Sequence, residues 1–292
     1  MARTQPLTGG MDRRTLMGAL ASAAALTSTR VRASDPAPIL RLAGRARQGG
    51  TLIGRTVPRG GIAVDGVDVG QASARGLFVL GLDRDSPAEV VISISDSGQP
   101  VGQRRLTVSP GDFDIQRIDG LPPQQVKPQG EDLLTRIAAE AERKAAGWAS
   151  RAETEDFAGG FTPPLRKFRV SGRFGGQRVL NGEPMTPHYG ADLAAPAGTP
   201  ILAPASGRVC FAETGLHYEG GLTMIDHGQG LVTAYLHQSA LTVRPGDAVV
   251  RGQIIGAVGR EGRATGPHLC WRMKWRDRRL DPMLLLNVRA PV

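Results

Sequence analysis

Short apolar runs, separated by glycine, proline and aspartate, dominate the chain from about residue 49 to residue 120. Residues 51–55 and 90–94 have the β-branched, apolar character of strands. The Asp65-Gly66 pair favours a tight hairpin turn. Regular turn signals without a helical repeat predict a small β-sandwich, which we place at residues 34–125. This region contains no histidine or cysteine, so we expect a binding or spacing module.

A helical repeat replaces this pattern after a group of prolines at residues 122–128. Apolar residues then recur every three or four positions over about five turns, with charged residues between them. We predict one amphipathic helix inside a linker at residues 126–165. Burial of its apolar stripe is favoured over a free spacer or a regulatory arm, because such stripes usually pack. The stripe consists of Leu134, Ile137, Ala138, Ala141, Ala145 and Trp148.

Strand-like runs return from Lys167 onward, and all five histidines of the chain lie in this last portion. We therefore place a second β domain at residues 166–292 and predict a mainly β fold with one connecting helix. Histidines gathered in one domain are typical of a site that binds metal or moves protons.

The first 33 residues have the pattern of an export signal. Arg13 and Arg14 precede an apolar run of about 14 residues, and small residues end at Ala33. The paired arginines resemble a twin-arginine signal, with Sec export as the alternative. The run is shorter than the roughly 20 residues of a membrane-spanning helix. We expect the mature protein to be exported to the periplasm or cell envelope and not to span the membrane.

Composition narrows the classes of function. Hydrophobic residues make up 40% of the chain and charged residues 22%, which is typical of a globular protein. The net charge of +9 includes five arginines and one aspartate of residues 1–33, so the remainder carries only +5. This excess suits an anionic cell envelope, and without a nucleic-acid motif we expect no nucleic-acid partner. Two cysteines exclude a multi-cysteine zinc finger.

Candidate chemistry lies in three segments of the last domain. His188 and Asp192 stand four residues apart in a segment whose prolines favour extended backbone. His237 ends an apolar strand-like run. His268 and Cys270 are two residues apart, so in a strand both side chains share one face. Nitrogen and oxygen ligands from one segment, completed by a distant third, are typical of a catalytic zinc site.

The segment from about Arg169 to Met283 resembles the lysostaphin-type (LytM-like) zinc peptidoglycan endopeptidases. The resemblance covers about 40% of the chain and implies a two-sheet antiparallel β fold with a groove. The motifs occur in the family's order; they are Gly172-Arg173-Phe174-Gly175, the His188/Asp192 pair, Pro196-Ala197-Gly198-Thr199-Pro200, Ile225-Asp226-His227-Gly228 and Thr265-Gly266-Pro267-His268-Leu269.

The resemblance implies that His188 and Asp192 are Zn²⁺ ligands. It further implies that His237 and His268 flank the attacking water as general base and transition-state stabiliser. The family's third ligand is a histidine two residues after the position of His268, where this chain has Cys270. Thiolate is a good zinc ligand, so we predict that Cys270 is the third ligand. The alternative is a disulfide between Cys270 and Cys210, which an oxidising compartment would permit.

From the resemblance we expect a zinc-dependent endopeptidase that cuts the peptide cross-links of peptidoglycan. The alternative is a degenerate, non-catalytic domain that binds peptidoglycan or activates a cell-wall amidase. Expected partners are peptidoglycan peptide stems, and an amidase or a divisome component. A biotinyl or lipoyl carrier is rejected, because Lys274 lies in a strand-like run and not at the hairpin tip that such carriers need.

Overall fold

The computed structural model describes residues 39–120 and 130–292, which fall into one unit formed by residues 38–292. The predicted export signal and the prolines at residues 122–128 lie outside the described residues. Within the described part, no helix is long and apolar enough to cross a membrane. Strands predominate there, and one α-helix accompanies them, which confirms the predicted mainly β fold class.

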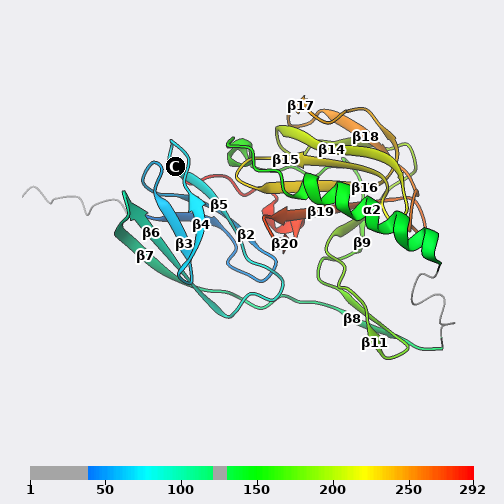
Figure 1. The fold of residues 1–292 in the computed structure, drawn as a ribbon, viewed down its shortest axis with the longest axis horizontal. Coiled ribbons are helices and arrows are strands. Elements are labelled where there is room, and N and C mark those ends of the chain that lie inside the picture. The colour runs from blue at the N-terminus through cyan, green and yellow to red at the C-terminus, as the bar shows by residue number, and fades with distance from the viewer. Residues whose placement is uncertain (1–38, 121–129) are drawn as a thin grey trace, which may run out of the picture. The chain divides into compact units, whose positions relative to one another are not determined.

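Two antiparallel sheets form the N-terminal part (Figure 1). One sheet has the order β1-β2-β5 and the other β4-β3-β6-β7. Asp65 and Gly66 connect β3 to β4 with φ of 51° and 81°, so the predicted hairpin is confirmed. Buried residues of both sheets, such as Phe78 and Ile92, share one apolar cluster. The strands are β1 (Arg41–Gly44), β2 (Thr51–Arg55), β3 (Gly61–Val64), β4 (Val67–Gln71), β5 (Leu77–Gly81), β6 (Glu89–Asp96) and β7 (Gln99–Thr107).

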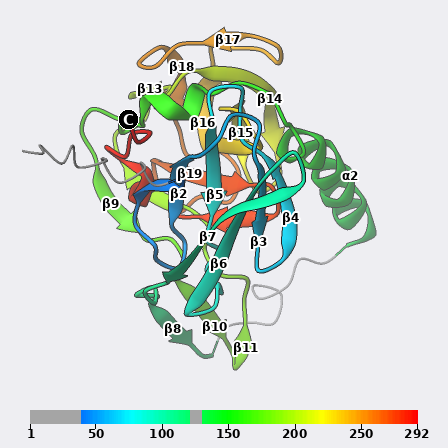
Figure 2. The ribbon, with the colours of Figure 1, turned by 90° about the vertical axis from the view of Figure 1, so that its left-hand side faces the viewer.

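A ten-stranded sheet forms the C-terminal part (Figure 2). Its main order is β17-β14-β15-β16-β19-β12-β9, with β13, β18 and β20 attached beside this path. Its strands are β9 (Arg169–Gly172), β12 (Ala191–Ala194), β13 (Pro200–Leu202), β14 (Gly207–Leu216), β15 (Gly220–Asp226), β16 (Leu231–Leu241), β17 (Ala248–Val249), β18 (Ile254–Val258), β19 (His268–Trp275) and β20 (Arg278–Leu280). Two 3-10 turns, η1 (Asp156–Gly159) and η2 (Pro282–Leu285), flank it in sequence.

The central strands of this sheet divide their side chains between two apolar clusters, because successive residues of a strand point to opposite faces. On β16, Leu231 and Tyr235 belong to the large cluster that continues into the N-terminal sheets. Val232, Ala234 and Leu236 belong to a smaller cluster, which Cys270 of β19 also joins. The predicted site therefore lies on the face of the smaller cluster.

The predicted helix is present as α2 (Glu131–Trp148), but of its predicted buried stripe only Trp148 packs against an apolar cluster. The buried residues of the helix are Glu140 and Gly147, whereas Leu134 is 49% exposed and the alanines of the stripe are exposed. A Cβ on Gly147 would lie 3.0 Å from Phe211 Cβ, so the helix backbone approaches β14 closely there. Polar contacts hold the rest of the helix, and alanine burial contributes too little to orient it.

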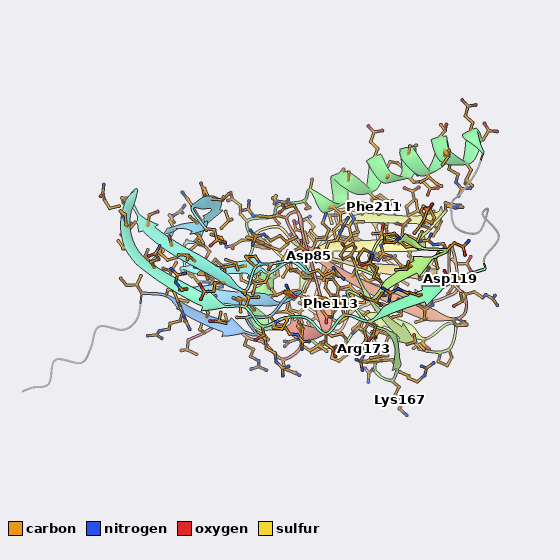
Figure 3. The ribbon with its side chains drawn as sticks, turned by 90° about the horizontal axis from the view of Figure 1, so that it is seen from below. Asp85, Phe113, Asp119, Lys167, Arg173 and Phe211 are labelled. Atoms are coloured by element: carbon orange, nitrogen blue, oxygen red, sulfur yellow. The ribbon has the colours of Figure 1, made fainter. Side chains whose placement is uncertain are left out.

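A small third sheet joins segments far apart in sequence. β8 (Ile115–Ile118) lies parallel to β10 (Gln177–Leu180), which pairs with β11 (Glu183–Pro184). Just before β8, the ring of Phe113, which is labelled in Figure 3, packs against Phe174 with centroids 6.1 Å apart. The end of the predicted N-terminal sandwich region thus reaches the turn that precedes His188.

Candidate active site

Antiparallel pairing of β12 with β19 brings the three predicted metal ligands together. Asp192 on β12 lies directly opposite Cys270 on β19, and His188 precedes β12. The Nε2 atom of His188 lies 3.1 Å from Asp192 Oδ1 and 3.4 Å from Cys270 Sγ. Within the described residues, these three side chains form a group whose ligand atoms all lie within 4.8 Å of one another.

The backbone holds His188 in the orientation that ligation needs. Its N–H donates to Gly176 O and its carbonyl accepts from Gly175 N–H, both at 2.7 Å. The ring Nδ1 lies 3.2 Å from the carbonyl oxygen of Arg173. A carbonyl can only accept, so this contact places a proton on Nδ1 and directs Nε2 at Asp192 and Cys270. Such a backbone contact is the usual way of fixing a ligating histidine.

The donor set fits zinc. Asp192 Oδ1 is buried and makes no hydrogen bond, although His188 Nε2 lies close to it. A cation between these atoms would satisfy the orphaned oxygen. One imidazole nitrogen, one carboxylate oxygen and one sulfur are ligands that zinc accepts, and three protein ligands are the number typical of a catalytic zinc site.

In the metal-free protein, His188 and Asp192 shift each other's pKa in opposite directions. Burial opposes the charged forms, but contact with Asp192 and Cys270 raises the pKa of His188 to about 10. Burial likewise opposes ionisation of Asp192, and contact with His188 lowers its pKa to about 2. His188 is therefore an imidazolium until a metal displaces its Nε2 proton.

His237 lies at an irregularity of β16. Residues 221 and 223 of β15 pair with residues 238 and 235 of β16, so β16 carries one extra residue there. His237 takes φ of 66°, a left-handed conformation that is rare for a residue with a side chain. Bulges next to active sites redirect side chains. The bulge turns His237 out of the regular strand alternation and towards His268.

His237 and His268 face each other beside the metal ligands, with ring centroids 4.6 Å apart. Nδ1 of His237 lies 2.7 Å from Glu261 O, and Nδ1 of His268 lies 2.8 Å from Gly266 O. Both contacts place a proton on Nδ1, so Nε2 is the nitrogen that each ring offers to the site. Nε2 of His268 lies 3.7 Å from Asp192 Oδ1. Burial lowers the pKa of His237 to about 4, so its ring is neutral at pH 7.

The alternative disulfide does not fit this topology. Cys210 lies on β14 and Cys270 on β19, with β15 and β16 between them. Three steps of about 4.8 Å between neighbouring strands separate their backbones by about 14 Å. A disulfide needs Cα atoms within about 7 Å. Both cysteines are free thiols, and Cys270 remains available to a metal.

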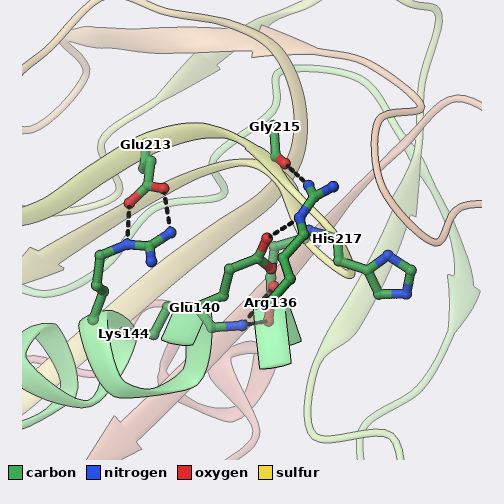
Figure 4. Close-up of polar contacts among 8 residues, drawn as sticks. Arg136, Glu140, Lys144, Glu213, Gly215 and His217 are labelled. Atoms are coloured by element: carbon green, nitrogen blue, oxygen red, sulfur yellow. Dashed lines mark hydrogen bonds and ion pairs between the residues drawn. The ribbon is translucent and has the colours of Figure 1, made fainter. Parts of the chain in front are cut away.

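Helix α2 contacts the β14–β15 hairpin through charged side chains (Figure 4). The Glu140 carboxylate accepts the backbone N–H of His217 at 2.8 Å and pairs with Arg136. Lys144 pairs with Glu219 at 2.7 Å, and both side chains are largely buried. The carbonyl of Glu219 in turn accepts the backbone N–H of His237 at 2.8 Å. Helix α2 is therefore connected to His237 through the hairpin between β14 and β15.

Sequence patterns did not reveal the groups that orient the histidines. The carbonyls of Arg173, Glu261 and Gly266 act through backbone atoms, which carry no side-chain signal. Glu140 gave a weak signal, as a carboxylate among the charged residues of an amphipathic helix. The other predicted positions share one site, because His188, Asp192, His268 and Cys270 all belong to β12, β19 or the segment before β12.

Known proteins are similar in sequence to this portion of the chain. Residues 186–282 match the model of Peptidase family M23. Peptidoglycan DD-endopeptidase ShyA of Vibrio cholerae serotype O1 is 39% identical over 126 residues, covering 41% of this chain and 28% of that protein. DD-carboxypeptidase/endopeptidase Mpg of Neisseria meningitidis serogroup B is 38% identical over 126 residues, covering 43% of this chain and 29% of that protein. The chain thus spans less than a third of these curated relatives.

The fold likeness extends further than the sequence likeness. A crystal structure from Pseudomonas aeruginosa assigned to peptidase M23 superimposes with a TM-score of 0.62 at 25% identity. It covers 83% of this chain and 95% of that one, so the likeness includes more than residues 186–282. Motif order, family match and fold agree on the region that contains the five candidate residues. Residues 186–282 are therefore similar in sequence to peptidase family M23.

Proposed function

We propose that this protein is a zinc-dependent endopeptidase that hydrolyses peptide cross-links of peptidoglycan in the cell envelope. The observation that carries the proposal is the convergence of three zinc-competent ligand atoms with two histidines whose Nδ1 atoms are held by backbone carbonyls. The relatives named as peptidoglycan endopeptidases supply the substrate class.

His188, Asp192 and Cys270 would hold the zinc. When bound, zinc supplies Lewis-acid chemistry, polarising the scissile carbonyl and making water acidic near neutral pH. Neutral His237 accepts a proton from the attacking water at Nε2, and the Glu261 carbonyl stabilises the imidazolium that results. His268, in the imidazolium form that carries a proton on both ring nitrogens, donates a hydrogen bond from Nε2 to the developing oxyanion. The imidazolium of His237 then returns its proton to the leaving amine.

Muropeptide digestion by the purified full chain, with and without a chelator, tests this proposal. We expect release of cleaved stems that the chelator stops and added zinc restores. His188→Ala should abolish both zinc content and release while far-ultraviolet circular dichroism stays unchanged. Full activity of His188→Ala would sink the site assignment.

The alternative function rests on Cys270, which replaces the family's histidine. A non-catalytic domain would bind peptidoglycan or stimulate a cell-wall amidase without releasing stems itself. No release by the zinc-loaded protein, together with stimulation of an added amidase, would establish that alternative.

A further inference from the structure

Beyond the site, β19 carries a row of cations on the same face as Cys270. Arg272 and Lys274 follow Cys270 at every second position of β19, which is the period of one strand face, and Arg276 lies in the turn directly after the strand. A Cβ on Gly190 would meet Cys270 Sγ at 3.0 Å and Arg272 Cγ at 2.8 Å, so both side chains extend to one side. We call Arg272, Lys274 and Arg276 the basic row. It leads away from the metal ligands in steps of about 6.7 Å.

The basic row is half-buried, and Arg272 at its start lies beside the Cys270 thiol. Among the described residues, none of its three members forms an ion pair within 4 Å. The Nε atoms of Arg272 and Arg276 are buried and make no hydrogen bond. Buried donors without an acceptor are costly, and like charges side by side add to that cost. The side chains of a solvated charged face would be exposed instead. The half-buried row therefore favours binding of an anionic ligand.

An open hollow of about 470 Å³ lies between the row and helix α2. Its lining includes Lys274, Arg276 and, on the α2 side, Arg151 and Trp148. The Lys274 ammonium lies 5.3 Å from the centre of the Trp148 ring. Of the acids in the lining, Glu219 is already paired with Lys144, and Asp277 is exposed. The hollow therefore combines uncompensated positive charge with the exposed alanines of α2.

We propose that the basic row binds the free carboxylates of the peptidoglycan stem peptide, in extended form, alongside the bond that is cut. The inference rests on the proposed function, because the row starts two residues from Cys270. An extended peptide has the same spacing per residue as β19, so carboxylates can meet successive cations. Guanidinium groups match carboxylates in geometry and charge. The row thus acts in substrate specificity, and the metal site in hydrolysis.

Kinetics with two matched cross-linked stem peptides test the role of the row, one with free carboxylates and one with the same groups amidated. We expect the wild type to show a KM about fivefold to tenfold lower for the free-carboxylate peptide. Lys274→Gln should remove most of this preference, change kcat less than about twofold, and leave the amidated peptide unaffected. Lys274→Arg should restore the preference, and Arg244→Gln, which removes an exposed charge elsewhere, should change nothing.

A binding measurement separates failure of the row from failure of the proposed function. Fluorescence anisotropy gives the Kd of both labelled peptides for the full chain stripped of metal, which cannot cleave them. A preference for free carboxylates that weakens with salt and with Lys274→Gln supports the row, even if no peptide is hydrolysed. Equal Kd for the two peptides, or binding of polyphosphate without binding of the stem, would overturn it. Hydrolysis of both peptides with equal KM would do the same and leave the proposed function standing.

Discussion

The two faces of β19 differ in what their side chains do. Trp271, Met273 and Trp275 point to one face and are almost fully buried in the large apolar cluster. Cys270, Arg272 and Lys274 alternate with them on the other face, where Cys270 belongs to the candidate metal site and Lys274 lines the hollow. One strand therefore stabilises the fold with one set of residues, and the other set would supply the proposed chemistry. Successive residues of β19 point to opposite faces, so substitutions can be made on one face without altering the other.

The largest effect is expected on the apolar face. Trp271→Ala removes a side chain that is 0% exposed and should lower the free energy of unfolding by about 3–5 kcal/mol. Urea denaturation measures this value. Lys274→Ala, on the opposite face, is the matched control and should change it by less than about 1 kcal/mol. Similar losses for the two variants would show that the faces are not separate.

The buried His227 gives a pH test of the apolar core. It is fully buried, lies between Ser206 O at 2.6 Å and Thr233 Oγ1 at 2.7 Å, and burial lowers its pKa to about 4. The unfolded state, with a pKa near 6.5, binds this proton more readily. The contribution of His227 to stability is therefore complete above pH 6.5 and is lost as the pH falls towards 4. The loss amounts to about 3 kcal/mol.

Denaturation of the metal-free protein at pH 7 and pH 4.5 checks this expectation. His237, whose pKa is lowered in the same direction, adds to the wild-type change, so the comparison is with His227→Gln. That variant should lose less stability on acidification than the wild type. An equal loss in both proteins contradicts the assignment of His227 as a neutral core residue.

On the site face, loss of either catalytic histidine should affect turnover and not metal. His237→Ala and His268→Ala should each lower kcat by about a hundredfold or more, because a proton acceptor or an oxyanion donor is removed. Zinc content by atomic absorption should remain near that of the wild type. Loss of metal in either variant would mean that the altered histidine is a ligand and that the roles are wrong.

The smallest effect concerns the replacement of histidine by Cys270. Histidine, aspartate and thiolate leave zinc with no net charge, whereas two histidines and one aspartate leave +1. The neutral centre is a weaker Lewis acid, so water should ionise at higher pH. Cys270→His should keep zinc, raise turnover several-fold and move the activity optimum to lower pH. A pH profile that stays in place would show that the sulfur does not tune the metal.

The alternation on β19 explains what the sequence could and could not predict. The shared face of His268 and Cys270, and the pairing of His188 with Asp192, follow from local spacing. No glycine marks the positive φ at position 237, so the direction of the His237 side chain was not predictable from the sequence. Burial of the basic row and attachment of α2 through Glu140 depend on long-range packing. Local polarity predicted a buried alanine stripe on α2, and this expectation was wrong.

X-ray absorption at the zinc edge tests the central claim most directly, namely that Cys270 shares a metal with His188 and Asp192. The zinc-loaded wild type should show one sulfur at about 2.3 Å, with nitrogen and oxygen ligands at about 2.0–2.2 Å. Cys270→His should lose the sulfur shell and keep zinc, and Cys210→Ser should retain both. A wild-type spectrum without sulfur, or a sulfur shell that survives in Cys270→His, would contradict this account of the site.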